Sequence, residues 1–217
     1  MTVTNHCNCS FKGVKNSMDM KKTTILLFLL VMAFGTKAQT LDSAALAEAP
    51  IVKSLAAALK EPEKVYRLEL KRIGLKTIPD DVYKLPNLQE LNLKGNKIKH
   101  LPAEIAQLKN LEVLNVSNNG LETLPPEIGK LANLKTLVIS QNEIEKLPPE
   151  MGELANLEVL DMWSNNIDEL PKQMKGLKKL RVIDMRAISM PDSQKDAIQE
   201  ILPNTVIHFS PGCNCGN

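Results

Sequence analysis

The residues best suited to covalent or metal chemistry are four cysteines and three histidines. Cys213 and Cys215 form a Cys-Asn-Cys motif late in the chain, and Cys7 and Cys9 form the same motif early in it. A disulfide across one intervening residue closes a small, strained loop and constrains the unfolded chain little. We therefore expect Cys213 and Cys215 to form an inert tail or a local disulfide, with intermolecular pairing and metal capture as the alternatives.

No catalytic constellation with a specific spacing accompanies these residues. The sequence contains no glycine-rich phosphate loop, no H-E-x-x-H and no G-x-S-x-G motif. His100 and His208 have no partner pattern, so we expect a surface residue and an edge residue. Glu104, Glu127 and Glu150 recur at one spacing and are expected in the first turns of short helices. The sequence thus predicts a protein that is not an enzyme and has no metal or cofactor site.

An N-terminal leader decides the expected compartment. Two lysines precede an apolar run from Ile25 to Phe34, and small residues follow up to Ala38. This order is typical of a secretory signal peptide, and ten apolar residues are too few to cross a bilayer. We expect translation to start at Met18 or Met20 and cleavage to follow Ala38. The product is then secreted, periplasmic or on the cell surface, without stable membrane insertion.

The composition favours one domain built from many similar layers. The chain has 217 residues, of which 43% are hydrophobic but only 3% aromatic. Its net charge is +2, and five of its 27 basic residues and one of its 25 acidic residues lie within positions 1–38. The remaining chain is therefore slightly acidic. We expect no nucleic-acid partner, because such binding depends on neutralising phosphates.

Leucines recur every 23 residues, at Leu88, Leu111, Leu134, Leu157 and Leu180. Four full units span 85–107, 108–130, 131–153 and 154–176, and diverged units occupy 65–84 and 180–190. Each full unit follows the pattern L-x-x-L-x-L-x-x-N-x-L. In the L-x-L part of this pattern, inward apolar residues alternate with residues that would face the other way. Such an alternation with a period of two predicts a short strand. Such a strand needs stacked neighbours on both sides, so we expect a parallel sheet.

An asparagine and a proline also recur once in each full unit. We expect the asparagine side chains to bond backbone groups of adjacent units as a ladder, because unpaired buried backbone groups are costly. Ile73 and Ile188 replace this asparagine in the terminal units, which puts regular turn geometry there in doubt. A proline follows Leu101 and its equivalents, so the far side of each coil is expected to be a short helix or 3-10 turn, as over Ala103–Gln107. The ladder residues are Asn96, Asn119, Asn142 and Asn165.

With its 23-residue L-P-x-E-I units, the segment 63–190 resembles the leucine-rich repeat family, in particular the typical repeats of bacterial and Ras-pathway scaffold proteins. The resemblance implies an α/β solenoid of about six units, a short right-handed horseshoe arc. Its concave face would carry the parallel sheet and its convex face short helices or 3-10 turns. Together with the leader, the resemblance implies an exported bacterial repeat protein.

A solenoid exposes its core at both ends and needs caps. We expect residues 1–38 to be leader, 39–62 a helical N-terminal cap and 191–209 a C-terminal cap, followed by a cysteine-containing tail at 210–217. The N-terminal cap reads as one or two helices broken near Pro50. The C-terminal cap reads as a helix over Ser193–Leu202, with Asp192 as N-cap, and a strand over Thr205–Phe209.

The strand residues that alternate with the inward leucines form the candidate binding surface. Their N-terminal end is charged, whereas their C-terminal half combines valines with Trp163 and a polar rim, the usual anatomy of an interface. The alternative is ordinary β propensity, with Trp163 folded onto its neighbours. We expect a protein or peptide ligand here; a self-associating structural component of the cell envelope is the alternative function. The predicted contact residues are Val113, Thr136, Val138, Val159, Asp161, Trp163, Val182, Asp184 and Arg186.

Overall fold

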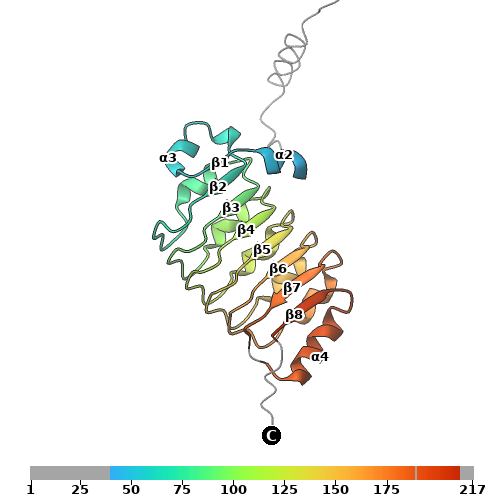
Figure 1. The fold of residues 1–217 in the computed structure, drawn as a ribbon. Helices are drawn as coiled ribbons and strands as arrows, with labels where there is room; N and C mark the ends of the chain where they lie inside the picture. The colour runs from blue at the N-terminus through green and yellow to red at the C-terminus, as the bar shows by residue number, and fades with distance from the viewer. Residues whose placement is uncertain (1–39, 189, 211–217) are drawn as a thin grey trace, which may run out of the picture. The chain divides into compact units, whose positions relative to one another are not determined.

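The computed structural model describes residues 40–188 and 190–210, which contain one parallel sheet of eight strands in chain order (Figure 1). The register advances by one 23-residue unit per strand from Arg67 to Val182. The predicted open solenoid with a parallel sheet is confirmed. Its strands are β1 (Ile51–Val52), β2 (Arg67–Glu69), β3 (Glu90–Asn92), β4 (Val113–Asn115), β5 (Thr136–Val138), β6 (Val159–Asp161), β7 (Val182–Met185) and β8 (Val206–Phe209).

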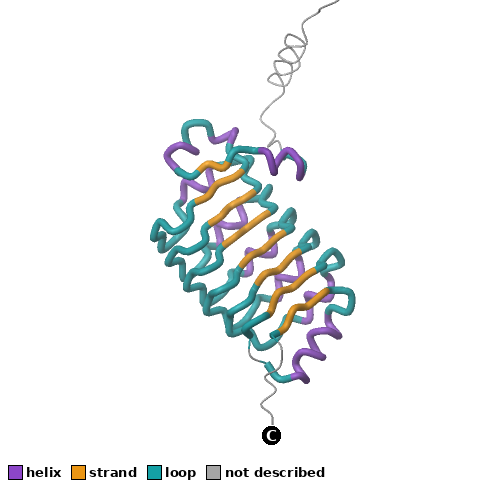
Figure 2. The backbone as a smooth tube through the Cα atoms, viewed as in Figure 1, coloured by secondary structure: helices purple, strands orange, loops and turns teal. Residues whose placement is uncertain are grey.

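Short 3-10 helices return the chain behind the sheet, where Figure 2 shows them in purple behind the orange strands. In each full unit a proline stands at the N-cap, and its restricted φ starts the helix without a donor to satisfy. The predicted 3-10 turn over Ala103–Gln107 is confirmed. The helices are η2 (Pro62–Lys64), η3 (Asp80–Lys84), η4 (Ala103–Gln107), η5 (Pro126–Lys130), η6 (Pro149–Glu153) and η7 (Lys172–Gly176).

The core lies between the strands and the 3-10 helices. The inward residue at the centre of every strand from β3 to β7 has no exposed surface, and the inward residue of η3 to η7 is equally buried. Burying one such aliphatic side chain stabilises by roughly 1.5–3 kcal/mol, so the repeated layer is the main source of stability. The strand residues are Leu91, Leu114, Leu137, Leu160 and Ile183; the helix residues are Val82, Ile105, Ile128, Met151 and Met174.

One residue in each coil adopts a left-handed backbone where the chain leaves its strand. These residues follow one another at 23-residue intervals with φ between 53° and 75°: Arg72, Gly95, Asn118, Gln141, Ser164 and Ala187. The coils that contain Ile73 and Ile188 thus keep the left-handed residue at its regular position, but the first of them has a second left-handed residue, Gly74, with a φ of 77°. The stacked neighbours impose the turn on Arg72 and Ala187 even though the ladder asparagine is missing there.

The N-terminal cap is helical only in part. Helix α2 (Ser43–Glu48) is capped by Asp42, and helix α3 (Leu55–Ala58) buries Ala58. Between them, β1 pairs with β2 and extends the sheet by one strand that the sequence did not predict. Pro50 ends helical backbone, and β-branched Ile51 and Val52 favour an extended chain.

The start of the described chain is fastened to the third strand's coil. The buried amide of Gln89 donates to the carbonyl of Leu41 at 2.8 Å and accepts from its backbone N–H at 2.6 Å. In addition, the Arg67 guanidinium donates to the carbonyls of Ala47 and Ala49. These contacts hold the cap across two coils.

The C-terminal cap consists of helix α4 (Asp192–Ile201) and β8, which pairs with β7. The helix begins one residue before the predicted start, with Pro191 at the N-cap, so the expectation that Asp192 caps it is wrong. As the first helical residue, Asp192 instead pairs with Lys195 at 2.7 Å. Ile198 and Leu202 are buried against the last coil. The leader and the four cysteines lie outside the described residues.

Candidate functional site

The outward side chains of the sheet form what we call the strand face. Each predicted contact residue lies at an outward strand position or just after a strand, and the pairing of the strands aligns them in rows. One row runs Val113, Thr136, Val159 and Val182, and it continues to Val206, which is 56% exposed. A second runs Val138, Asp161 and Asp184, and it continues to His208. The sequence reading left out Val206 and His208, although the V-I-H-F alternation could have placed both on this face.

An open hollow of about 340 Å³ occupies the strand face over β6, β7 and β8. It brings together residues that come from three different coils. Its walls are apolar on the Val159–Val182 side and charged on the other. The lining residues are Val159, Leu160, Asp161, Val182, Asp184, Arg186 and His208.

Asp184 is neutralised within its own strand end. The Arg186 guanidinium donates to its carboxylate through Nε at 3.0 and 3.1 Å and through Nη2 at 2.6 Å. The Arg186 backbone N–H adds a bond of 3.1 Å. The hydrogen bond from Arg186 lowers the pKa of Asp184 below its ordinary value and outweighs the opposing effect of burial. This pair therefore carries no net charge at neutral pH.

Asp161, the neighbour of Asp184 in the same row, has weaker partners. Its carboxylate accepts from the Trp163 backbone N–H at 3.4 Å and from the Ser140 hydroxyl at 3.3 Å. No ion pair to Asp161 occurs within residues 40–188 and 190–210. Burial raises the pKa of Asp161, and the nearby Asp184 adds to the rise. The face thus holds a partly desolvated carboxylate that forms no ion pair, although the charge of Arg186 acts on it and opposes the rise in its pKa.

Trp163 is the single tryptophan of the chain and stands two residues after the end of β6. Its side chain is partly exposed, and its backbone carbonyl accepts from the N–H of Gln141 at 2.9 Å. It follows Asp161 by two residues, beside Arg186 in the next coil. A partly exposed tryptophan is the residue type that most often dominates binding energy.

At the N-terminal end of the strand face, the charged side chains form ion pairs with one another. Arg67 contacts Glu90 at 2.6 Å, with both side chains partly buried. Lys71 contacts Glu69 at 3.1 Å, and Lys53 approaches the same carboxylate at 3.9 Å. Because these charges already have partners, a charged ligand group would gain less here than at the C-terminal half of the strand face.

The asparagine ladder holds the coils that carry this face. The Asn142 amide donates to the carbonyls of Val116, Ile139 and Ser140 at 2.8 to 3.3 Å. Its Oδ1 accepts from the backbone N–H groups of Asn119 and Leu121. Asn96, Asn119 and Asn165 bond their own and the preceding coil in the same way. Each amide therefore satisfies backbone groups of two coils.

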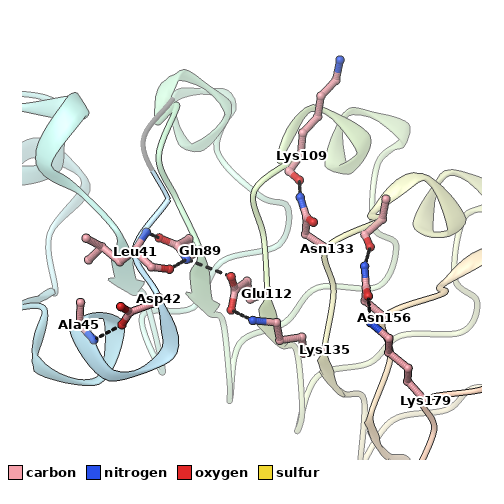
Figure 3. A network of polar contacts seen from close by, with 11 residues as sticks. Leu41, Asp42, Ala45, Gln89, Lys109, Glu112, Asn133, Lys135, Asn156 and Lys179 are labelled. Carbon is pink, nitrogen blue, oxygen red and sulfur yellow. Dashed lines mark hydrogen bonds and ion pairs between the residues drawn. The ribbon is translucent and has the colours of Figure 1, made fainter. Parts of the chain in front are cut away.

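A second asparagine ladder lies just before the strands, and it was not predicted from the sequence. The amides of four asparagines donate to a backbone carbonyl of the preceding coil at 2.7 to 2.8 Å, and Figure 3 shows two of these contacts. The signal was present, because an asparagine precedes the second leucine of each full unit. The residues are Asn87, Asn110, Asn133 and Asn156, and Lys179 donates to Asn156 from the position that would come next.

The remaining candidates for chemistry lie apart from one another. His100 is exposed in a bridge to Thr123, whereas His208 lies in the edge strand β8. Glu104, Glu127 and Glu150 occupy the first turns of η4, η5 and η6, as predicted. Within the described residues, no three acidic, histidine or cysteine side chains gather closely enough to bind a metal. No helix among those residues has the length and apolarity to span a bilayer.

Comparison with known families decides the architecture. The model of the leucine-rich repeat region matches residues 64–137 and 126–199. The chain belongs to the leucine-rich repeat family. No curated protein matches the sequence significantly.

Solved leucine-rich repeat structures share this fold over part of their length. An internalin of Listeria monocytogenes is 20% identical, with a TM-score of 0.61 over 73% of this chain and 45% of its own. The plant peptide hormone receptor RGFR1, in complex with RGF2, is 29% identical, with a TM-score of 0.55 over 65% of this chain and 24% of its own. A repeat protein of Leptospira interrogans is 29% identical, with a TM-score of 0.49 over 74% and 54%. This leucine-rich repeat chain thus spans at most about half of each matched structure.

Proposed function

We propose that this leucine-rich repeat protein is an exported, non-catalytic module that binds a protein or peptide on its strand face. The contact residues are those that the sequence predicted, joined by Val206 and His208. The observation that carries the proposal is the row of outward strand residues from Val113 to Val206, in which four of the five residues are valines.

An apolar row with a charged margin has the composition of a binding surface rather than of ordinary solvent-facing sheet. The plant receptor, a structural relative, was solved in complex with RGF2, so this fold can present a face to a protein or peptide. Eight strands at about 4.8 Å spacing span only about 34 Å. The ligand is therefore an extended peptide, a loop or a small domain.

Selection followed by substitution tests this function. A displayed library of random peptides is selected on the wild-type protein, and the recovered peptides are then measured against Trp163→Ala. We expect a loss of about 2 kcal/mol or more, roughly thirtyfold in affinity, because a central tryptophan usually dominates an interface. Lys172→Ala, on η7 behind the sheet, is the matched control and should bind normally. Equal binding by both variants would place the site elsewhere.

Export rests on the leader sequence and needs its own test. The protein is expressed with its natural start, and the product from the medium and the cell envelope is sequenced from its N-terminus. A sequence that begins at Gln39 would support cleavage after Ala38. A product that retains Met1 would contradict it.

Self-association is the second candidate, and the outer edge of β8, which pairs with no strand of the described residues, favours it. The sheet order ends at β8, whose Val206 is exposed, and an unpaired edge strand can add a strand from another molecule. Light scattering with and without reductant distinguishes the two functions. A monomer at all concentrations supports the binding module, and a concentration-dependent oligomer supports the structural role.

A further inference from the structure

The hollow over β6, β7 and β8 has an unbalanced charge. Its titratable or charged lining residues are Asp161, Asp184, Arg186 and His208. Arg186 neutralises Asp184 through three side-chain hydrogen bonds. One arginine and two aspartates give the hollow one surplus acidic side chain, and that side chain is Asp161.

From this we infer that the hollow receives the basic side chain, lysine or arginine, of the bound protein or peptide. The inference rests on the proposed function and specifies the ligand that the strand face selects. A ligand cation would pair with Asp161 while its aliphatic stem packs on Val159 and Val182, as long basic side chains commonly do.

The existing partners of Asp161 leave room for such a cation. Hydrogen bonds of 3.3 and 3.4 Å are long for a carboxylate, which ordinarily forms its strongest bonds at 2.7–2.9 Å with cationic donors. The carboxylate is partly desolvated, so an ion pair formed there is screened less than one in open water. The raised pKa of Asp161 has the same cause.

Other ligand groups fit the hollow less well. An acidic side chain would have to displace Asp184 from Arg186, because Arg186 is the only cation among the lining residues. A neutral apolar side chain would cover the valines but would remove water from Asp161 without replacing it, which is costly for a charged group.

Three capped tripeptides test the inference directly. They are acetyl-Ala-Arg-Ala-amide, the same peptide with norleucine, and the same peptide with glutamate. Binding is followed by the fluorescence of Trp163, the only tryptophan, and by amide chemical shifts over β6 to β8. We expect saturable binding of the arginine peptide, about tenfold weaker binding of the norleucine peptide and none of the glutamate peptide.

Two variants should change this affinity in opposite directions. Asp161→Asn keeps the shape and should weaken the arginine peptide about tenfold. Arg186→Gln releases Asp184 and should strengthen it about threefold, a gain that mere structural damage does not produce. Asp168→Asn, an exposed carboxylate outside the hollow, is the control and should change nothing. Equal affinity for arginine and norleucine, no response to either peptide, or a loss in Arg186→Gln would each overturn the inference.

Failure of this inference is distinguishable from failure of the proposed function. A library-selected peptide that requires Trp163 but is indifferent to Asp161→Asn, and contains no required basic residue, would sink the inference alone. A selected peptide that is indifferent to Trp163→Ala would sink the proposed site as well.

Discussion

The Oδ1 atom of Asn142 accepts a hydrogen bond from the backbone N–H of Asn119 at 3.2 Å, so one rung of the ladder supports the rung before it. The same amide reaches three carbonyls and a second N–H. Because Asn142 is buried, water cannot replace these bonds when the side chain is removed.

Removal of one rung should therefore cost much of the protein's stability. We expect Asn142→Ala to lower the free energy of unfolding by about 2–4 kcal/mol, since several buried backbone groups lose their partners. Urea unfolding followed by circular dichroism measures it. Asn166→Ala, an exposed asparagine of the next coil, should change stability by less than about 0.5 kcal/mol. Similar effects of the two substitutions would contradict the ladder's role.

Glycine should be favoured at the left-handed turn. Gln141 has a φ of 56°, a conformation that costs a residue with a Cβ roughly 1 kcal/mol. We expect Gln141→Gly to raise the melting temperature, because relief of this strain outweighs the entropy cost of glycine. The reciprocal change, Gly95→Ala, should lower it, because φ is 75° and the new Cβ would lie 2.8 Å from Cγ of Arg72. A gain in Gly95→Ala would show that the turn relaxes freely.

Two glycines of η6 and η7 should respond differently to alanine. A Cβ on Gly152 would lie 2.5 Å from the carbonyl oxygen of Gln173, whereas a Cβ on Gly176 would meet its nearest neighbour at an ordinary 3.6 Å. Gly152→Ala should therefore destabilise by about 1–3 kcal/mol through overpacking between coils. Gly176→Ala should be neutral or slightly stabilising. Differential scanning calorimetry compares the two, and equal melting temperatures would argue against close packing of these helices.

Tyr83 predicts a loss of stability in alkali. Burial, followed by the charges of Glu104 and Asp80, raises the pKa of Tyr83 from 10.0 to about 12. Between these values the unfolded phenol ionises while the folded one keeps its proton, so stability falls as pH rises from 10.0 toward 12. This component should disappear in Tyr83→Phe, as measured by urea unfolding across that range.

The same variant tests the hydroxyl itself. The Tyr83 hydroxyl is buried without a hydrogen-bond partner in the described part of the chain. At neutral pH, Tyr83→Phe should therefore be neutral or stabilise by up to about 1 kcal/mol. A clear loss of stability would reveal a hydrogen bond that the hydroxyl makes.

The sequence was sufficient for the repeated layers because period and side-chain type act together there. Leucines spaced by 23 residues predicted the buried columns, and strand alternation predicted which residues face outward. It did not reveal β1, because two residues are too short for any periodicity. The contact between Leu41 and Gln89 was equally invisible, since it joins residues 48 positions apart through one side chain.

The candidate site shows the same limit. Sequence register placed Asp161 and Asp184 side by side, but it could not say that Arg186 neutralises only one of them. That distinction depends on side-chain geometry at the end of β7. His208 joined the hollow only because the C-terminal cap adds its strand to the same sheet in the same register.

The uniform register between coils also bears on how this protein can change. If one more 23-residue coil were inserted between β4 and β5, its strand would pair with both neighbours in the same register as the existing strands. Neither cap would have to change. Such a duplication would lengthen the strand face by about 4.8 Å, which corresponds to roughly one and a half residues of an extended ligand. The number of coils would therefore set the length of ligand that fits, whereas the outward residues of each coil would set the chemistry that the ligand must have.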